Sequence, residues 1–292
     1  MRQIESLTYT NELGESVMFA HTALYNPQTI SGLSDVRNTI FSIGSMGQDG
    51  DTFVGSRIES RDIDIAGQIR ERDPQKMREA RRNLARVLNP QLTATLTYRF
   101  GSFVRVIGCR TRNAPTITKP AQQVYAGFSV SLECLNPFWR EEAERRDDIA
   151  AWVGCFEFPL EIPETGFEFG YRQPSLIVNV FNGGDVRCGL RAEFKALGAV
   201  ENPVIIDMDT KQQIKLNLSM QDGDVVSLCT RYGEKSATLH RGGVLTAALR
   251  YVDVGSEFLQ LRPGDNLLRY DAAQGLENLE VSIYHHNLYL GV

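Results

Sequence analysis

Much of the chain consists of short segments in which apolar and polar residues alternate. Clear examples are Arg61–Ile65, Thr93–Tyr98, Phe103–Ile107 and Phe128–Leu132. Because neighbouring side chains of a strand point to opposite faces, this period-2 pattern predicts half-buried β-strands. Ile63 and Ile65 would share one face of their strand, and the neighbouring aspartates would share the other. The pattern therefore favours a mainly β fold.

One segment has helical spacing instead. Asp73 is a suitable N-cap, and Pro74 suits the first position of a helix. Apolar residues then recur at helical spacing up to Leu88, and Asn89-Pro90 follows as a stop signal. The sequence predicts one helix after residue 73, packed against the strands of the first half.

The second half contains short β-rich runs separated by turn pairs. The turn pairs are Asn182-Gly183, Asp222-Gly223, Tyr232-Gly233 and Pro263-Gly264. The runs are 175–181, 190–196, 204–206, 214–218, 225–230, 236–239, 258–261, 266–270 and 279–284. Such regular short spacing is typical of an antiparallel β-sandwich. We therefore expect a β-rich α+β N-terminal domain with one packed helix, followed by a C-terminal antiparallel sandwich.

The two halves differ in charge. Residues 1–146 carry 19 basic and 16 acidic side chains, whereas residues 147–292 carry 12 and 20. Between the halves runs Arg140–Asp148, in which every residue except Ala143 is charged, as in a solvated linker or helix surface. We place a domain boundary near residue 150 and expect domains at 1–150 and 151–292.

Several classes of protein are disfavoured by composition. Of the 292 residues, 42% are hydrophobic, which is a globular composition, and no window approaches the ~18 apolar residues of a membrane span. The first residues lack the apolar stretch of a secretory signal, so we expect synthesis in a cytoplasm. The five cysteines are widely spaced without a Cys-x-x-Cys motif, which predicts buried, reduced thiols.

Local motifs for catalysis are missing. The sequence has no Gly-x-Ser-x-Gly, no His-Glu-x-x-His and no Gly-Lys pair. His285 and His286 are adjacent and would point to opposite faces of a strand, which disfavours a shared metal. Asp49-Gly50-Asp51 lacks the downstream glutamate of a calcium loop, and residues 44–55 instead suggest a glycine-rich mobile loop. We expect no enzyme activity, no cofactor and no metal.

The predicted helix carries a basic surface. Residues 70–86 contain seven arginine or lysine residues and only three acidic residues. Such a surface could be solvated, could form a salt-bridged protein interface, or could meet phosphates, although no aromatic residue is interleaved and the whole chain is acidic. The residues we single out as a candidate protein interface are Arg78, Arg81, Arg82 and Arg86 of the helix with Asp62 and Asp64 of the acidic strand face.

The order of several motifs resembles one known family. The motifs are Gly32-Leu33, Arg61–Ile65, Leu84–Pro90, Leu96–Cys109, Leu132–Trp139, Phe258–Asn266 and the ending Tyr289–Val292. In this order they resemble the distal tail proteins of long non-contractile-tailed phages, the siphovirus-type tail component family. The resemblance covers roughly residues 20–292, but neither 34–60 nor 149–171 contains a motif that aligns.

The resemblance implies a structural protein of the virion. Members of the family form a hexameric hub ring through their N-terminal domains at the distal end of the tail, and carry a galectin-like or carbohydrate-module-like C-terminal sandwich. Expected partners are further copies of the chain, the tail tube protein, the tape measure protein, and tip and receptor-binding proteins. No specific nucleic acid and no membrane insertion are implied. Ring contacts join two different surfaces, and the arginine-rich helix and the acidic strand face are our candidates for them.

A second function remains open at this point. The C-terminal sandwich could be a carbohydrate-binding adhesion module that contacts the host surface. Exposed aromatic side chains that stack on sugar rings would be needed, and Tyr232, Tyr251 and Tyr270 are the candidates. A ring would favour the structural hub, whereas a monomer would be compatible with the adhesion module.

Overall fold

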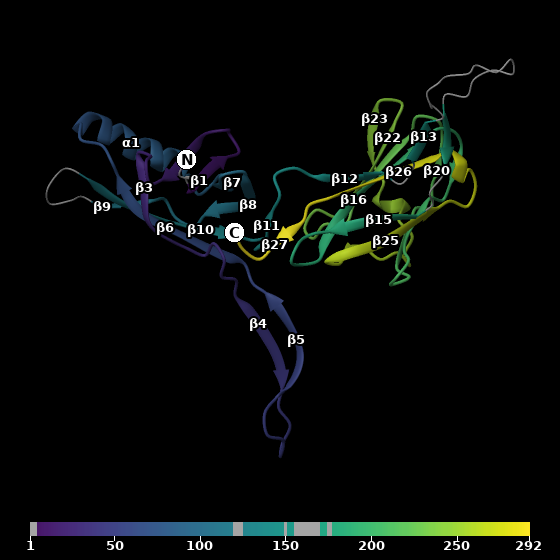
Figure 1. Cartoon of the computed structure of the whole chain (residues 1–292), viewed down its shortest axis with the longest axis horizontal. Coiled ribbons are helices and arrows are strands. Elements are labelled where there is room, and N and C mark those ends of the chain that lie inside the picture. Colours follow the sequence, from purple (N-terminus) through teal and green to yellow (C-terminus); the bar gives the residue numbers. More distant parts are fainter. Residues whose placement is uncertain (1–4, 119–124, 149–150, 155–169, 174–176) are drawn as a thin grey trace, which may run out of the picture. The chain divides into compact units, whose positions relative to one another are not determined.

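The structure, a computed structural model, describes residues 5–118, 125–148, 151–154, 170–173 and 177–292 (Figure 1). It contains two compact units. Unit 1 comprises Met1–Glu142 and Leu288–Val292, and unit 2 comprises Ala143–Asn287. The chain therefore leaves unit 1 eight residues before the boundary predicted near residue 150, and its last five residues return there. The assignment of all of 151–292 to one domain missed this return.

Unit 1 contains twelve described strands and one helix, and ten of these strands form a sheet that closes on itself. Its elements are β1 (Glu5–Asn11), β2 (Ser16–Ala20), β3 (Tyr25–Ser31), β4 (Asn38–Ile43), β5 (Thr52–Ile58), β6 (Arg61–Ile69), α1 (Pro74–Val87), β7 (Ala94–Phe100), β8 (Phe103–Thr111), β9 (Thr116–Thr118), β10 (Ala126–Cys134), β11 (Trp139–Arg140) and β27 (Leu288–Tyr289). The order is β27-β11-β8-β7-β1-β2-β3-β6-β10-β9, and a further pairing of β8 with β10 closes the sheet into a barrel-like loop.

The core of unit 1 follows the alternation in the sequence. Ile63 and Ile65 of β6 are fully buried, while Asp62 and Asp64 on the other face are not. The helix begins where the sequence predicts, because the Asp73 carboxylate accepts hydrogen bonds from the backbone N–H groups of residues 75 and 76. Leu84 and other apolar residues of α1 join the same core. The predicted helix is thus confirmed.

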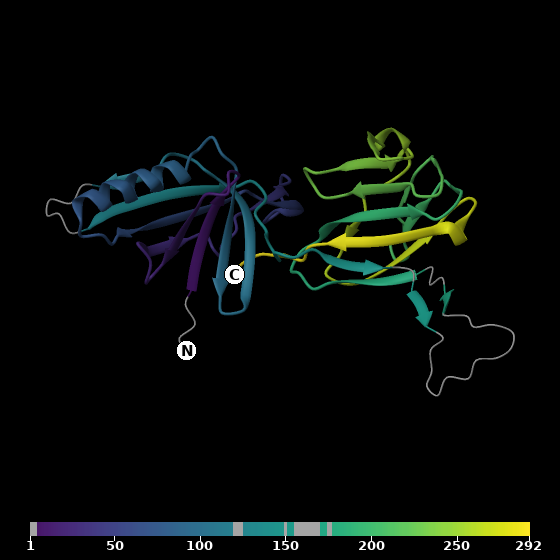
Figure 2. The same cartoon turned by 90° about the horizontal axis from the view of Figure 1, so that it is seen from above.

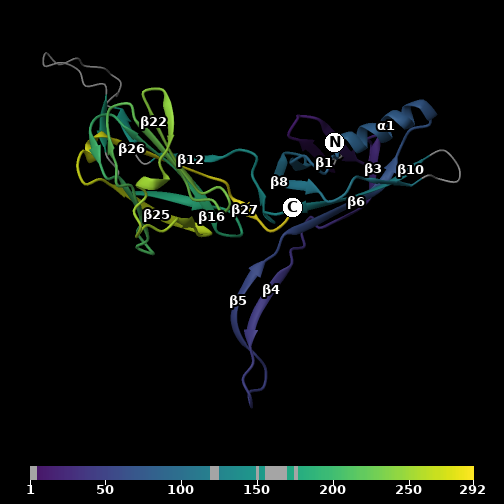
Figure 3. The same ribbon diagram turned by 180° about the vertical axis from the view of Figure 1, so that it is seen from behind.

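Strands β4 and β5 form a separate antiparallel hairpin that leaves the main sheet of unit 1 (Figures 1 and 3). They pair only with each other, from Asn38 opposite Ile58 to Ile43 opposite Thr52. The glycine-rich loop expected at 44–55 is therefore shorter than predicted, because Thr52 already begins β5. Residues flanking this loop have the β-branched and aromatic composition of strands.

Unit 2 is an antiparallel β-sandwich, as predicted. Its elements are β12 (Arg145–Asp148), β13 (Ala151–Gly154), β14 (Gly170–Gln173), β15 (Ile177–Asn182), β16 (Cys188–Ala196), β17 (Val200–Glu201), β18 (Val204–Asp207), β19 (Gln213–Lys215), β20 (Ser219–Met220), β21 (Val225–Cys229), β22 (Ser236–Arg241), β23 (Val244–Ala247), η1 (Leu249–Tyr251), β24 (Gln260–Leu261), β25 (Gly264–Asp271), η2 (Leu276–Asn278) and β26 (Leu279–His285). One sheet has the order β12-β26-β16-β21-β22-β23, with β24 beside β16, and the other has the order β15-β25-β18-β19.

The core of unit 2 draws on both sheets. Phe194 of β16 and Val226 of β21 are fully buried, as are Val180 of β15 and Tyr270 of β25. The buried Asn266 side chain donates hydrogen bonds to the carbonyls of residues 180, 262 and 264. These bonds stabilise the turn before β25. Both units therefore have the predicted mainly β architecture.

Candidate protein interface

Three of the four arginines predicted as an interface, Arg78, Arg82 and Arg86, are exposed on the polar side of α1, away from its buried residues. Arg78 and Arg82 are exposed and line an open depression of about 480 Å³ with Gln75 and Glu79. The Arg78 Nε donates to the carbonyl of Pro74 on the preceding turn, at 3.4 Å. This part of the helix presents guanidinium groups to the outside of unit 1.

The other two predicted arginines have different surroundings. Arg86 forms an ion pair with Glu15, at 3.1 Å, and donates to the Asn83 side chain. Arg81 is half-buried. The four residues therefore do not form one uniform surface, and Arg78 and Arg82 are the pair that shares an exposed site.

The acidic strand face is partly compensated within unit 1. Asp62 accepts a hydrogen bond from Arg112 at 2.8 Å, and the same guanidinium lies 3.5 Å from Glu133 on the adjacent strand β10. Asp64 accepts from the hydroxyl of Ser131. Asp62 and Asp64 share one face, as predicted, but Arg112 already supplies the counter-charge of Asp62.

Arg61 was not singled out from the sequence, yet its side chain holds three segments together. It is 2% exposed, and its Nε donates to the carbonyl of Pro137 at 2.8 Å. Nη1 donates to the carbonyls of Gly32 and Leu33, each at 2.8 Å, and Nη2 to the carbonyl of Leu290. A signal was present, because residue 61 has the parity of Ile63 and Ile65 and so belongs to the buried face.

The β4–β5 hairpin was also missed, and it is the most apolar exposed element of unit 1. Its exposed large apolar residues are Ile40, Phe41, Ile43, Met46, Phe53 and Val54, which are between 52% and 107% exposed. Five of them lie on the two strands, where they occupy both faces, and Met46 lies in the loop between the strands. An isolated two-stranded hairpin is marginally stable in water, so an element of this kind needs a partner surface.

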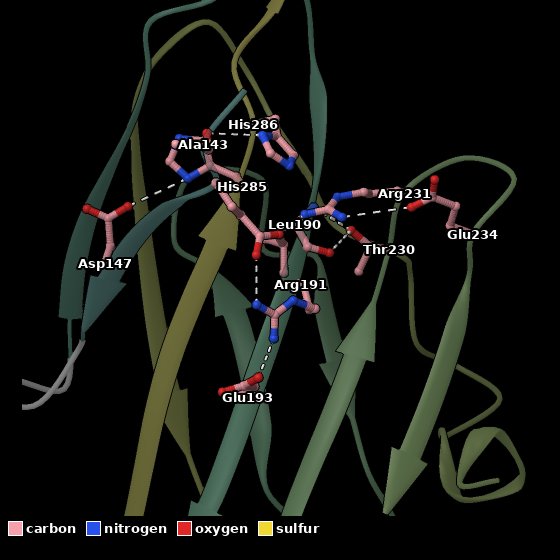
Figure 4. A network of polar contacts seen from close by, with 11 residues as sticks. Ala143, Asp147, Leu190, Arg191, Glu193, Thr230, Arg231, Glu234, His285 and His286 are labelled. Atoms are coloured by element: carbon pink, nitrogen blue, oxygen red, sulfur yellow. Dashed lines mark hydrogen bonds and ion pairs between the residues drawn. The ribbon is translucent and has the colours of Figure 1, made fainter. Parts of the chain in front are cut away.

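A polar network ties the start of unit 2 to its larger sheet. The Glu144 carboxylate accepts hydrogen bonds from the guanidinium groups of Arg191, at 2.8 Å, and Arg231. Arg191 also bonds Glu193 (Figure 4). The Arg191 guanidinium lies 3.9 Å from the ring centre of Tyr284. Burial alone raises the pKa of the Glu144 carboxyl, but the hydrogen bonds and charges of the two arginines outweigh it and lower this pKa.

The two adjacent histidines have separate contacts. The buried His285 ring lies with Nδ1 3.6 Å from Asp147, whereas the His286 ring lies 3.2 Å from the carbonyl of Ala143 (Figure 4). His285 is more buried than the half-exposed pair predicted from sequence. In the described part of the chain no three His, Cys, Asp or Glu side chains are grouped so as to hold a metal ion. The longest described helix, α1, has 14 residues and does not qualify as a membrane span.

Only one of the three candidate sugar-stacking tyrosines is well exposed. Tyr232 is 74% exposed, with the ammonium of Lys235 5.5 Å from its ring centre. Tyr251 is half-buried beneath the guanidinium of Arg250. Tyr270 is 0% exposed, so its proposed role in stacking on a sugar is wrong.

Comparisons with known proteins find a family match within each of the two units. Residues 14–134 match the family described as the phage tail protein RIFT-related domain, and residues 183–289 match the siphovirus-type tail component, C-terminal domain. The crystal structure of Dit from phage SPP1, described as a paradigm of the hub adsorption apparatus, superposes over 97% of this chain and 98% of its own with a TM-score of 0.70. The chain belongs to the siphovirus distal tail protein family.

A similar fold occurs in a solved baseplate structure. A chain of the phage P2 baseplate in its activated, Ca-containing conformation gives a TM-score of 0.50, and 98% of each chain is covered. Sequence identity is 12% to SPP1 Dit and 11% to the P2 chain, so these likenesses rest on the fold. No curated protein sequence matches. As a distal tail protein, the chain is a structural component of the phage tail and its baseplate hub.

Proposed function

We propose that the chain forms a hexameric ring at the distal end of the tail and joins the tail tube to the tip or baseplate. Unit 1 would build the ring, and unit 2 would be presented to other tail proteins. The proposed partners are further copies of the chain, the tube and tape measure proteins, and tip and receptor-binding proteins. The role is structural rather than enzymatic, and the chain is made in the host cytoplasm before assembly.

The observation that supports a ring most strongly is the β4–β5 hairpin. Fully burying one large aliphatic or aromatic side chain contributes about 1.5–3 kcal/mol. The hairpin exposes six such side chains, so one covered hairpin would contribute several kcal/mol to each contact. Contacts in a cyclic assembly are heterologous, which means that a protruding arm on one subunit meets a different surface on the next.

The basic surface of α1 is proposed as a second, electrostatic contact. Arg78 and Arg82 would face carboxylates of a neighbouring tail protein, with Arg81 and Arg86 at the margin of that contact. Asp62 and Asp64 stay candidates for the partner surface in the ring. Because Asp62 is already paired with Arg112, its contribution there would be smaller than that of an unpaired carboxylate.

The hairpin contact is tested with serine substitutions. Phe41→Ser and Phe53→Ser together should leave the folding of unit 1 intact, because the hairpin pairs only with itself. They should reduce ring formation at least tenfold. Leu13→Ser is the matched control, since Leu13 is 69% exposed in the turn between β1 and β2 but belongs to no apolar cluster. If the wild type, the double variant and Leu13→Ser all form rings equally well, the hairpin is not the ring contact.

Carbohydrate binding is kept as the alternative function because of one residue. Tyr232 is a largely exposed aromatic side chain on unit 2. If unit 2 binds host sugars through it, a glycan array should show signals that Tyr232→Ala removes and Tyr232→Phe retains. Identical arrays for wild type and Tyr232→Ala would exclude this site.

A further inference from the structure

The larger sheet of unit 2 has two borders of opposite chemical character. β12 forms one border, and all four of its residues, Arg145 to Asp148, are charged. β23 forms the other border, and its sequence Val-Leu-Thr-Ala carries no charge. In Figure 2 the strands of this sheet are stacked from the teal β12 to the light-green β22–β23 hairpin. Charged edge strands disfavour pairing with other chains, so the β12 border is protected. No strand of the described residues pairs with the outer side of β23, which lacks this protection.

The register of the hairpin shows which backbone groups of β23 face outward. Arg241 pairs with Val244 across the Gly242-Gly243 turn, and Leu239 pairs with Thr246. The backbone N–H of Ala248 donates to the carbonyl of Ala237, at 2.8 Å, which fixes the hydrogen-bonded pairs of the ladder. Since such pairs alternate, the N–H and C=O groups of the residues between them point away from β22. Those residues are Leu245 and Ala247.

The side chains at this border are apolar as well. Val244 is 60% exposed and Leu245 is 71% exposed, and Leu249 just after the strand is 48% exposed. An added strand would therefore find both outward backbone groups and an apolar surface. Strand addition gains affinity from main-chain hydrogen bonds and specificity from alternate side chains.

Two exposed nitrogen-bearing side chains lie beside the β23 border, and one of them, Arg250, is a cation. His240, exposed on β22, is directly opposite Leu245, and Arg250 is exposed shortly after β23. Arg250 contacts the Tyr251 side chain, with 2.8 Å to its hydroxyl, rather than a described carboxylate. A segment that carries a carboxylate next to apolar residues would complement the Arg250 guanidinium and the exposed apolar side chains of β23.

We propose that β23 is a docking edge for an extended, acidic and apolar segment of another tail protein, which adds to the sheet as a strand. This proposal builds on the tail role of the chain but does not depend on a hexameric ring. The contact would use the backbone of Leu245 and Ala247. Its specificity would therefore depend on an extended conformation of the partner segment as well as on its side chains.

The first test is hydrogen exchange at single-residue resolution in purified wild-type tails and in the isolated chain. The amides of Leu245 and Ala247 should exchange at least tenfold more slowly in tails. Those of Thr246 and Ala248 should be protected in both states because they bond within the hairpin. Equal exchange of Leu245 and Ala247 in both states would overturn the proposal. Protection in the isolated chain that grows with its concentration would also overturn it, by showing that the edge pairs with a second copy.

The second test removes one outward donor. Ala247→Pro deletes an N–H that the hairpin does not use, and proline is accepted on an edge strand at such a position. Ala247→Val, the matched control, keeps the N–H. Tails with Ala247→Pro should contain the chain in normal amounts, but the amount of one other tail protein in them should be at least tenfold lower than in wild-type tails. Tails with Ala247→Val should contain all their proteins in normal amounts. Complete tails with both variants would overturn the proposal, whereas loss of ring formation with Ala247→Pro alone would show that the edge serves the ring.

Discussion

The guanidinium of Arg61 donates to the carbonyl of Leu290, so the start of β6 is bonded to the C-terminal segment of the chain. Trp139 reinforces this contact, because it lies opposite Tyr289 in the β11–β27 pair and its Nε1 donates to the carbonyl of Leu33, at 2.9 Å. Ser34 likewise donates to the carbonyl of Val292. The last five residues are thus a structural part of unit 1.

Replacing Arg61 should destabilise unit 1. Arg61→Met removes hydrogen bonds to four carbonyls in a buried site, and carbonyls left without a donor are costly. We expect the free energy of unfolding in urea to fall by about 2–4 kcal/mol. Arg99→Met, at an exposed position on β7, should change it by less than ~0.5 kcal/mol. Similar values for the two variants would show that the Arg61 contacts contribute little.

The boundaries of unit 2 predict which fragment folds best. A fragment of residues 143–287 keeps β12, which pairs with β26, and keeps Glu144 with both of its arginines. A fragment of residues 151–292 loses these contacts and carries the five residues that belong to unit 1. Circular dichroism melts should show a cooperative transition for 143–287 and a lower midpoint for 151–292. A higher midpoint for 151–292 than for 143–287 would instead support a domain boundary near residue 150.

The Glu144 network predicts a dependence of stability on pH. The pKa of this carboxyl is lowered in the folded protein, so its ionisation stabilises the fold at pH values above the unfolded pKa of about 4.3. This contribution is lost as the pH falls from there through the lower folded pKa. Glu144→Gln should cost about 1–3 kcal/mol at pH 7, and the difference from wild type should shrink below about pH 4.

Chemical denaturation at pH 7 and pH 3 measures this dependence. Glu142→Gln is the control, since Glu142 is exposed two residues before Glu144. A Glu144→Gln effect that has the same size at both pH values would contradict an ionic role for Glu144.

Buried thiols should resist modification. Burial raises the pKa of Cys134 and of Cys188 to about 12, and Cys109 is raised in the same direction. Because thiol reagents react with the thiolate, these cysteines should stay unmodified in the native protein at pH 8 and react once it is denatured. Site-resolved mass spectrometry after brief labelling would reveal rapid reaction at any of the three, which would contradict their burial. Cys155 lies outside the described residues.

Much of the architecture could be predicted because alternation reports burial directly. Asp62–Ile65 alternates between the two faces as expected, and Asp73-Pro74 starts the helix. In unit 2 the turn pairs lie between the strands that were expected, as Asp222-Gly223 does before β21. Local periodicity and turn chemistry dominate in these segments.

The sites were harder to predict because they depend on contacts far apart in the sequence. Arg61 meets Leu290 across 229 positions, and only the three-dimensional fold reveals the buried carbonyls around it. The β4–β5 hairpin has apolar residues on both faces, so it lacks the alternation of a half-buried strand. Asp62 was expected to be available to a partner, but its pairing with Arg112 depends on how the strands align.

The proposed ring is tested most directly by the mass of the purified wild-type chain. Sedimentation velocity at micromolar concentrations and low salt should show a species six times the chain mass of 32.7 kDa. Electron images of the same sample should show closed six-fold rings. A single 32.7 kDa species at every concentration, or closed rings with another number of subunits, would contradict the hexameric hub.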